Sequence, residues 1–123
     1  MKRILIAEDD KFIASAYKLK LTKMGFEVEV VADGQEAVDF LSKSLPDLIL
    51  LDLVMPNKDG FATLQEIKAN DKWKNIPVIV ASNLGQKEDV DRAAALGAAG
   101  YIVKTTVTIS ELVEKVKLVL AKL

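Results

Sequence analysis

Short runs of leucine and β-branched residues alternate along the chain with longer segments in which apolar side chains recur every three or four positions. The runs occupy residues 4–7, 28–31, 48–51, 78–81 and 101–103. Apolar strands separated by amphipathic helices are typical of a parallel β-sheet that is covered by helices on both faces. We therefore predict an α/β fold in which five strands are each followed by a helix, in one domain over residues 1–123.

The first predicted helix has one apolar face and ends at a glycine. The apolar residues recur at spacings of four, four and three positions and are Ile13, Tyr17, Leu21 and Met24. Gly25 follows them and should close the helix, because glycine readily adopts the left-handed conformation of a helix C-terminus. Gly97 should end the fourth helix, over residues 86–96, in the same way.

The three other helices begin at residues whose side chains can accept a hydrogen bond from the first helical turn. These N-caps are Asp33, Asp59 and Thr108, and a glutamate follows the first and the last of them three residues later, as in a capping box. The second helix should run to about Lys43 and the third to Asn70. In the fifth helix, a stripe that we predict to lie in the core consists of Ile109, Leu112, Val113, Val116 and Leu120.

Polar residues follow four of the five predicted strands at the same end. They are Glu8, Asp9 and Asp10 after the first strand, Asp52 after the third, Ser82 after the fourth and Lys104 after the fifth. The carboxyl ends of parallel strands share one edge of the sheet, where ligands bind at the point at which strand order reverses. Carboxylates that converge there either raise their pKa values or hold a cation. Because Mg²⁺ prefers oxygen ligands, we predict a Mg²⁺ site at this edge.

The composition excludes several kinds of chemistry. The chain has no cysteine and no histidine, so it has no disulfide, no thiol nucleophile and no phosphohistidine of its own. Its 17 basic and 18 acidic residues give a net charge of -1, which creates no long-range field to attract nucleic acid or an anionic membrane. No segment approaches the roughly 20 apolar residues of a membrane span. We expect a cytoplasmic protein that is a monomer or a weak dimer.

Four motifs carry a family resemblance. They are, in order, Ile-Leu-Ile-Ala-Glu-Asp-Asp, Leu-Asp-Leu-Val-Met-Pro-Asn-Lys-Asp-Gly, Ile-Pro-Val-Ile-Val-Ala-Ser and Gly-Ala-Ala-Gly-Tyr-Ile-Val-Lys. With them, the chain resembles the receiver domains of two-component response regulators, especially the single-domain chemotaxis type, from Lys2 to the last helix. The resemblance implies a flavodoxin-like, doubly wound sheet with strand order 2-1-3-4-5. It also implies a stand-alone receiver without an output domain.

The resemblance implies a role for each acidic residue at the sheet edge. Asp52 would be the nucleophile that accepts a phosphoryl group from a histidine kinase, a phosphotransfer protein or a small phosphodonor. Asp9 would bind Mg²⁺ directly together with Asp52, Glu8 would hold a metal-bound water, and the backbone carbonyl of Val54 would complete the protein ligands. Asp10 is better explained as the residue that begins the first helix, because the helix dipole favours an acid there.

Three more residues would respond to the phosphoryl group. Lys104 would place its ammonium against the phosphoryl oxygens, and Ser82 would donate its hydroxyl to them. Tyr101 would then turn its ring inward as the loop after the fourth strand moves. This change would alter the binding of a downstream protein to the surface formed by the fourth helix, fifth strand and fifth helix.

Three other residues are predicted to lie near the site without reacting, or away from it. Pro56 and Gly60 should shape the loop after Asp52, proline by restricting φ and glycine by adopting conformations that other residues cannot. Trp73 should lie beyond the third helix, away from the site.

Two departures from the family pattern lead to specific hypotheses. Thr105 stands where family members usually have a proline in a cis peptide bond, so we predict a trans Lys104-Thr105 bond. Val54 and Leu84 occupy positions where rapidly dephosphorylating relatives carry polar side chains. Because neither can orient an attacking water, we expect slow autodephosphorylation.

Three alternatives remain at this point. The chain could be a receiver-like module that binds a partner without phosphorylation, although all the acidic and cationic elements are retained. A Mg²⁺-dependent phosphohydrolase with an aspartyl nucleophile typically has a second acid two residues after the first, where this chain has Val54. A flavin-binding protein is disfavoured because no Ser-, Thr- or Gly-rich phosphate loop follows the first strand. We therefore expect a signalling domain and not a conventional enzyme.

Overall fold

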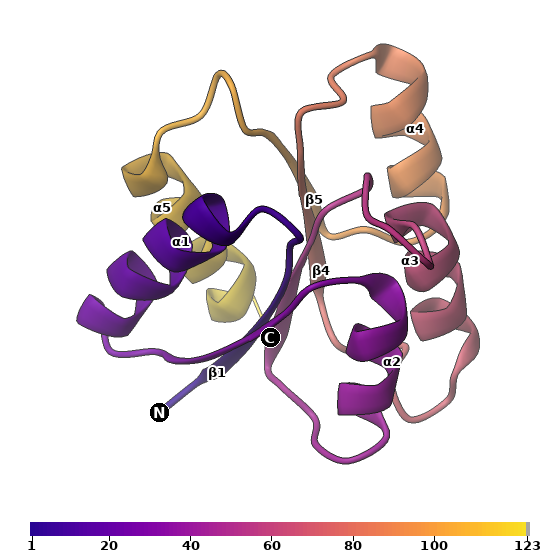
Figure 1. Cartoon of the computed structure of the whole chain (residues 1–123), viewed down its shortest axis with the longest axis horizontal. Coiled ribbons are helices and arrows are strands. Elements are labelled where there is room, and N and C mark those ends of the chain that lie inside the picture. Colours follow the sequence, from indigo (N-terminus) through magenta and orange to yellow (C-terminus); the bar gives the residue numbers. More distant parts are fainter. Residues whose placement is uncertain (123) are drawn as a thin grey trace.

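The computed structural model describes residues 1–122, and in it five parallel strands form one sheet (Figure 1). The strands are β1 Arg3–Ala7, β2 Glu27–Val31, β3 Leu48–Leu51, β4 Val78–Ser82 and β5 Gly100–Val103. Their order is β2-β1-β3-β4-β5, so that Ile4 of β1 lies between Val28 and Leu48. The flavodoxin-like fold is therefore confirmed, and each strand end lies within one residue of its predicted position.

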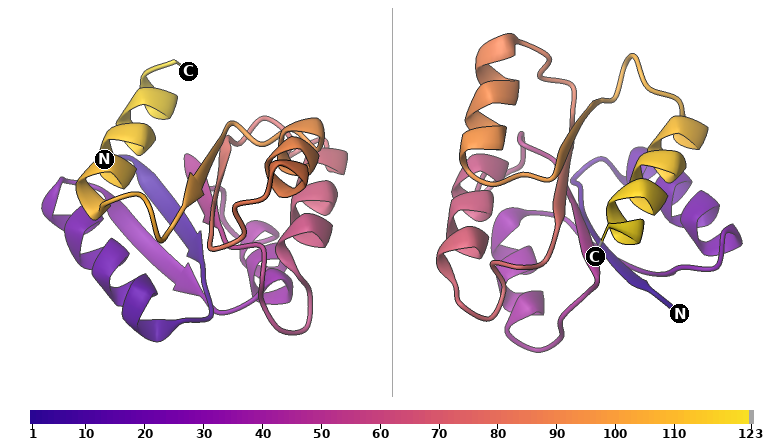
Figure 2. Two further views of the ribbon diagram at one scale, coloured as in Figure 1. Left: turned by 90° about the horizontal axis from the view of Figure 1, so that it is seen from above. Right: turned by 180° about the vertical axis from the view of Figure 1, so that it is seen from behind.

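Five helices cover the two faces of this sheet. They are α1 Lys11–Lys23, α2 Gly34–Leu41, α3 Gly60–Ala69, α4 Lys87–Ala95 and α5 Ile109–Ala121. The helices α1 and α5 lie on one face, and α2, α3 and α4 lie on the other (Figures 1 and 2). The three-layer arrangement explains why the central strands are apolar throughout, since both of their faces are covered.

The core consists of one apolar cluster on each side of the sheet. Alternate residues of a strand belong to different clusters: Leu5 packs on the side of α2–α4, and Ile6 packs on the side of α1 and α5. Both are almost fully buried, as are Leu64 of α3 and Val113 of α5. Burying a leucine or isoleucine side chain contributes about 1.5–3 kcal/mol, so these clusters hold the strands in the register that forms the site.

The helices begin at the predicted capping residues. An Asp10 carboxylate oxygen accepts the N–H of Phe12 at 2.9 Å, which confirms that Asp10 begins α1. Thr108 and Glu111 form a complete capping box at α5. Asp33 caps α2, but Glu36 accepts from the N–H of Ala32, one residue before the expected donor. Gly25 and Gly97 follow α1 and α4 with positive φ angles of 95° and 100°, as expected for residues that close helices.

The end of α2 and the burial of Ile109 also differ from the prediction. The helix α2 ends at Leu41 and not at Lys43, because the Ser42 hydroxyl bonds locally to the carbonyl of Asp39 at 2.7 Å. Ile109 is 37% exposed, although it was predicted to lie in the core. It is the first residue of α5 and lines a groove against α1, so it does not reach the sheet as Val116 does.

A helix that crosses a lipid bilayer must be both long and apolar. Within residues 1–122, none of the helices has both the length and the apolar character needed to pass through a bilayer.

Candidate functional site

The polar residues that follow the strands meet at one edge of the sheet. The N–H of Asp52 donates to the carbonyl of Ala7 at 3.0 Å, which continues the pairing of β1 with β3 and brings Asp52 beside Glu8. The N–H of Lys104 donates to the carbonyl of Ser82 at 2.9 Å and continues the pairing of β4 with β5. Strand pairing alone therefore brings together residues that are far apart in the sequence.

Glu8, Asp52 and Lys104 form a buried ionic cluster. The Lys104 ammonium donates to Oε1 of Glu8 and, at 3.1 Å, to Oδ2 of Asp52. The three side chains are at most 8% exposed. Asp9 is exposed at the rim of the cluster. The structure thus brings Asp52, the predicted nucleophile, close to the predicted cation Lys104. The predicted acids Glu8 and Asp9 lie beside them.

Charge is distributed unequally within the cluster. Burial, reinforced by Asp52, raises the pKa of Glu8 to about 8. Burial also acts to raise the pKa of Asp52, but the interactions with Glu8 and Lys104 outweigh it and hold that pKa below its ordinary value. Burial alone would lower the pKa of Lys104, but the two neighbouring carboxyl groups raise it. Asp52 is therefore a carboxylate at neutral pH, which is the nucleophilic form, and Lys104 is a cation.

The acidic residues fit a magnesium ion. Glu8, Asp9 and Asp52 each offer a carboxylate oxygen, and these oxygens lie within 4.8 Å of one another. Within residues 1–122, the buried Oε2 of Glu8 has no hydrogen-bond partner. Leaving a buried polar atom unpaired costs about 1–3 kcal/mol, which a hydrated cation would relieve. An all-oxygen donor set of this kind suits Mg²⁺.

Ser82 and Tyr101 both contact the backbone of one residue, Leu84. Ser82 is fully buried, and its Oγ accepts the N–H of Leu84 at 3.3 Å. The Tyr101 hydroxyl donates to the carbonyl of Leu84. The ring of Tyr101 already packs against the core cluster on the side of α2–α4. A shift of the backbone at Leu84 would therefore act on both predicted switch residues.

The loops beside the cluster are held by short contacts. The N–H of Val54 donates to Oδ1 of Asp52 at 3.3 Å, while the Val54 side chain is exposed. Further along the same loop, Asn57 donates to Oδ2 of Asp33 at 2.6 Å and so ties the loop to the start of α2. On the other side, the Lys104-Thr105 bond is trans, as predicted.

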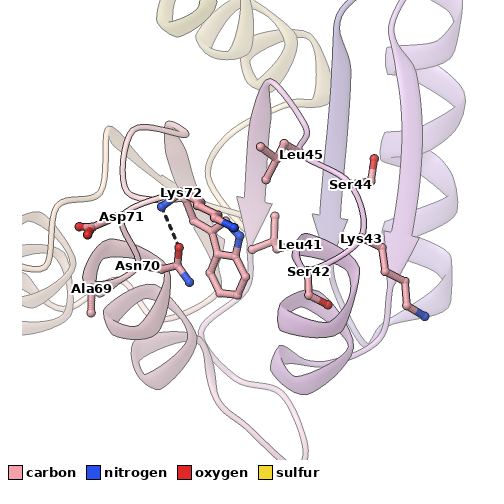
Figure 3. Close-up of a pocket in the computed structure, with 10 residues that line it drawn as sticks. Leu41, Ser42, Lys43, Ser44, Leu45, Ala69, Asn70, Asp71 and Lys72 are labelled. Carbon is pink, nitrogen blue, oxygen red and sulfur yellow. Dashed lines mark hydrogen bonds between the residues drawn. The ribbon is translucent and has the colours of Figure 1, made fainter.

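The structure also has a cavity that is not part of this site. It measures about 710 Å³ and lies between the C-terminal ends of α2 and α3 (Figure 3). Leu41 and Leu45 line one side of it, and Asn70 and Lys72 line the other. Trp73 also lines this cavity, which confirms that it lies beyond α3 and away from the acidic cluster.

The sequence matches a known family over most of its length. A family model, the response regulator receiver domain, matches residues 4–117. The chain belongs to this family. As a receiver domain it is part of two-component signalling and is not a conventional enzyme, and family members bind Mg²⁺ at an acidic pocket.

Known receivers are similar to this receiver domain in structure. The signal receiver domain of a signal transduction histidine kinase from Syntrophus aciditrophicus is 36% identical, with a TM-score of 0.92 over 100% of this chain and 92% of that one. Chemotaxis protein CheY4 of Vibrio cholerae is 27% identical, with a TM-score of 0.88 over 95% of this chain and 97% of that one.

A curated relative is longer than this receiver domain. The DNA-binding dual master transcriptional regulator RpaA of Synechocystis sp. is 35% identical over 104 residues, which are 85% of this chain and 43% of RpaA. The chain therefore spans less than half the length of this relative, and likewise of the relatives from Guillardia theta and Cyanophora paradoxa.

Two residues, Tyr17 and Asn57, lie beside the site of the receiver domain although no signal in the sequence indicated this. Tyr17 lines a small cavity directly beneath Glu8, Asp52 and Lys104, although its helical spacing had indicated only an apolar face. Asn57, which contacts Asp33, has a left-handed backbone with φ of 67°. A Pro-Asn pair suggests a turn, but a turn signal does not name the residue that the asparagine will bind.

Proposed function

We propose that this receiver domain accepts a phosphoryl group on Asp52 and that the modified domain binds a downstream protein differently. The main support is the buried contact of Lys104 with both Asp52 and Glu8, beside three carboxylate oxygens that lie within 4.8 Å of one another. The Lys104 ammonium, a cation at neutral pH, lies next to the Asp52 carboxylate and can stabilise the charge that phosphoryl transfer spreads over the phosphoryl oxygens.

The reaction is a single displacement at phosphorus. A carboxylate oxygen of Asp52 forms a bond to phosphorus while the bond from phosphorus to the donor's leaving atom breaks. The leaving group keeps the bonding electron pair and takes a proton from water. The donor is a phosphohistidine of a sensor kinase or phosphotransfer protein, or a small phosphodonor, and it is a separate molecule because the chain has no histidine that could carry the phosphoryl group itself.

Each neighbouring residue has a part in this step. Lys104 moves from the Asp52 oxygen to a phosphoryl oxygen, and Ser82 donates its hydroxyl hydrogen to another. Asp9, Asp52 and the carbonyl of Val54 would hold Mg²⁺, with Glu8 acting through a metal-bound water. Bound Mg²⁺ would neutralise charge on the phosphoryl oxygens.

The signal leaves the site through Leu84. Ser82 accepts the N–H of Leu84, and Tyr101 donates to the carbonyl of the same residue, so a new bond from Ser82 to the phosphoryl group would move the Leu84 backbone and change the contact of Tyr101. Tyr101 lies on the edge strand β5, between α4 and α5. We infer that a partner protein binds the surface formed by α4, β5 and α5, and that its affinity changes when Tyr101 moves. The net charge of -1 gives no reason to assign nucleic-acid binding to residues 1–123 themselves.

Intact-mass measurement tests the proposal. The chain is incubated with Mg²⁺ and acetyl phosphate, in parallel with the Asp52→Asn variant, which keeps the shape of the side chain but removes its charge. We expect a phosphoryl adduct on the wild type alone. Equal adducts on both proteins would place the modification elsewhere. Their absence from the wild type, even with a set of histidine kinases, would favour a module that binds without phosphorylation.

The lifetime of the acyl phosphate is the next prediction. Val54 and Leu84 are apolar and cannot orient a water for attack on phosphorus. We expect the label to persist well beyond seconds after the donor is removed, and Val54→Asn to shorten its lifetime about tenfold or more. Leu19→Asn, an exposed apolar-to-polar change on α1, serves as the control. Loss of label from the wild type within seconds, without a phosphatase, would contradict this prediction.

A further inference from the structure

Tyr17 is the aromatic residue that lies beneath the ionic cluster. It is 8% exposed and packs in the core cluster on the side of α1 and α5. It also lines a cavity of about 10 Å³ whose other walls include Glu8, Asp52 and Lys104. This volume is close to the smallest that holds one water molecule. A phenol is therefore placed against the charged groups of the site.

The direction of α1 explains how Tyr17 reaches the site. The helix begins at Asp10, at the carboxyl edge of the sheet, and Tyr17 lies roughly 10 Å further along its axis. Side chains of a helix lean toward its N-terminus, so the ring of Tyr17 leans back toward the acidic edge. Tyr17 contributes to the core cluster and also lines the cavity beside the ionic cluster.

The hydroxyl of Tyr17 is neutral and can accept a hydrogen bond. Burial raises its pKa, and the opposing effect of Lys104 is smaller, so the phenol keeps its proton at neutral pH. A protonated phenol is both a donor and an acceptor. The charged groups that act on this phenol are Lys104, Glu8 and Asp52.

The Lys104 ammonium has three hydrogens to donate, and two of them have an acceptor in the structure. An ammonium group carries three N–H donors, and the structure shows acceptors for two of them, on Glu8 and Asp52. The Lys104 side chain is 8% exposed, so bulk water does not readily serve the third. Tyr17, which lines the same cavity, carries a neutral acceptor that adds no negative charge to a site that already holds several carboxyl groups.

We propose that Tyr17 is a positioning residue for Lys104: one water in this cavity accepts the third ammonium hydrogen and donates to the Tyr17 hydroxyl. This inference rests on the proposed phosphoryl transfer for its consequence. Lys104 must exchange an Asp52 oxygen for a phosphoryl oxygen, and a partner below the ammonium holds the nitrogen at the site while the other contacts change. Tyr17 lies in α1 and outside the strand-end motifs.

The Tyr17→Phe variant removes only the hydroxyl oxygen and keeps the ring that packs in the core. We expect its rate of phosphorylation by acetyl phosphate to fall about fivefold, the effect of losing one net hydrogen bond. The same substitution in a Lys104→Met background should cause no further fall, because the residue that Tyr17 positions is then missing. Urea unfolding of each variant establishes that it is folded. Equal falls in both backgrounds, or no fall in either, would overturn the proposal.

A second measurement does not depend on phosphorylation. The ammonium hydrogens of a buried, hydrogen-bonded lysine exchange slowly enough for detection by ¹H–¹⁵N NMR, and the Lys104 signal is the one that disappears in Lys104→Met. We expect Tyr17→Phe to shift this signal and to speed its exchange with water severalfold. An unchanged signal, or none in the wild type, would overturn the proposal. If the wild type gave this signal but no phosphoryl adduct, the proposed function would fail while the positioning of Lys104 by Tyr17 stood.

Discussion

Gly60 shows how closely the main chain packs behind Asp52. It is the first residue of α3, and its N–H donates to the carbonyl of Leu53 at 2.9 Å. A Cβ atom on Gly60 would lie 2.1 Å from the carbonyl oxygen of Asp52 and 2.5 Å from the Cα of Leu53. The expectation that Gly60 provides an unusual backbone conformation is wrong, because its φ is not positive. The glycine is needed for space.

This contact predicts a loss of stability for Gly60→Ala. The added methyl group meets main-chain atoms that cannot rotate away, so we expect the free energy of unfolding to fall by about 1–3 kcal/mol. Gly85→Ala is the matched control, since its Cβ would contact only the Val103 methyl groups, at 3.4 and 3.5 Å. That change should stay within about 0.5 kcal/mol. Urea unfolding measures both, and equal losses would contradict the steric explanation.

The start of α2 is joined to the loop that follows β3. Asp33 accepts the N–H of Glu36 at 2.8 Å and the amide of Asn57 at 2.6 Å. The N–H of Gly34 donates to the carbonyl of Lys58 at 3.2 Å. The bond from Glu36 first, and that from Asn57 second, lower the pKa of Asp33 from its ordinary value of 3.8. The charged form of Asp33 is therefore the form that ties these two elements together.

A pH dependence of stability follows for Asp33. Because its pKa is lower in the folded chain, its charge stabilises the fold above pH 3.8, and this contribution is lost as the pH falls through the folded-state pKa. Asp33→Asn keeps a capping oxygen but does not titrate. In urea unfolding, the stability of the wild type relative to Asp33→Asn should be constant from about pH 7 to about pH 5 and should shrink in stronger acid. A difference that is constant throughout would contradict the role of the charge.

The candidate metal site joins strands that are far apart in the sequence. Glu8 and Asp9 follow β1, Asp52 follows β3, and Lys104 follows β5. An ion that requires the first three in their folded positions binds the native state and not the unfolded chain. Its binding free energy therefore adds to the stability of the entire fold.

Adding Mg²⁺ should stabilise the chain as a single unit. At a concentration 100 times its Kd, the gain in the free energy of unfolding should be about 2.7 kcal/mol, and EDTA should remove it. Thermal or urea unfolding measures the gain. Asp9→Asn is the control, because Asp9 is exposed and its loss should leave the fold intact while the gain shrinks. A gain of equal size in Asp9→Asn, or none in the wild type, would contradict the assignment of the ligands.

Much of the fold could be predicted because its signals are local. The strands required only runs of apolar residues, and the N-caps at Asp33, Asp59 and Thr108 required only a side chain within reach of the next helical turn. The candidate site could be predicted because parallel strands end at one edge. The misplaced Ile109 shows the limit of this reasoning, since the correct helical period did not reveal that the first turn of α5 lies beyond the sheet.

The amino-acid sequence by itself determined the class of fold, the ends of most elements and the residues able to carry charge at the sheet edge, because period, capping and residue chemistry act between near neighbours. Only the tertiary structure decided that Lys104 touches both Glu8 and Asp52, and that Gly60 lies against the backbone of Asp52. It also decided that Tyr17 lies beneath this cluster. These contacts join different elements, and their distances depend on how helices and strands pack together.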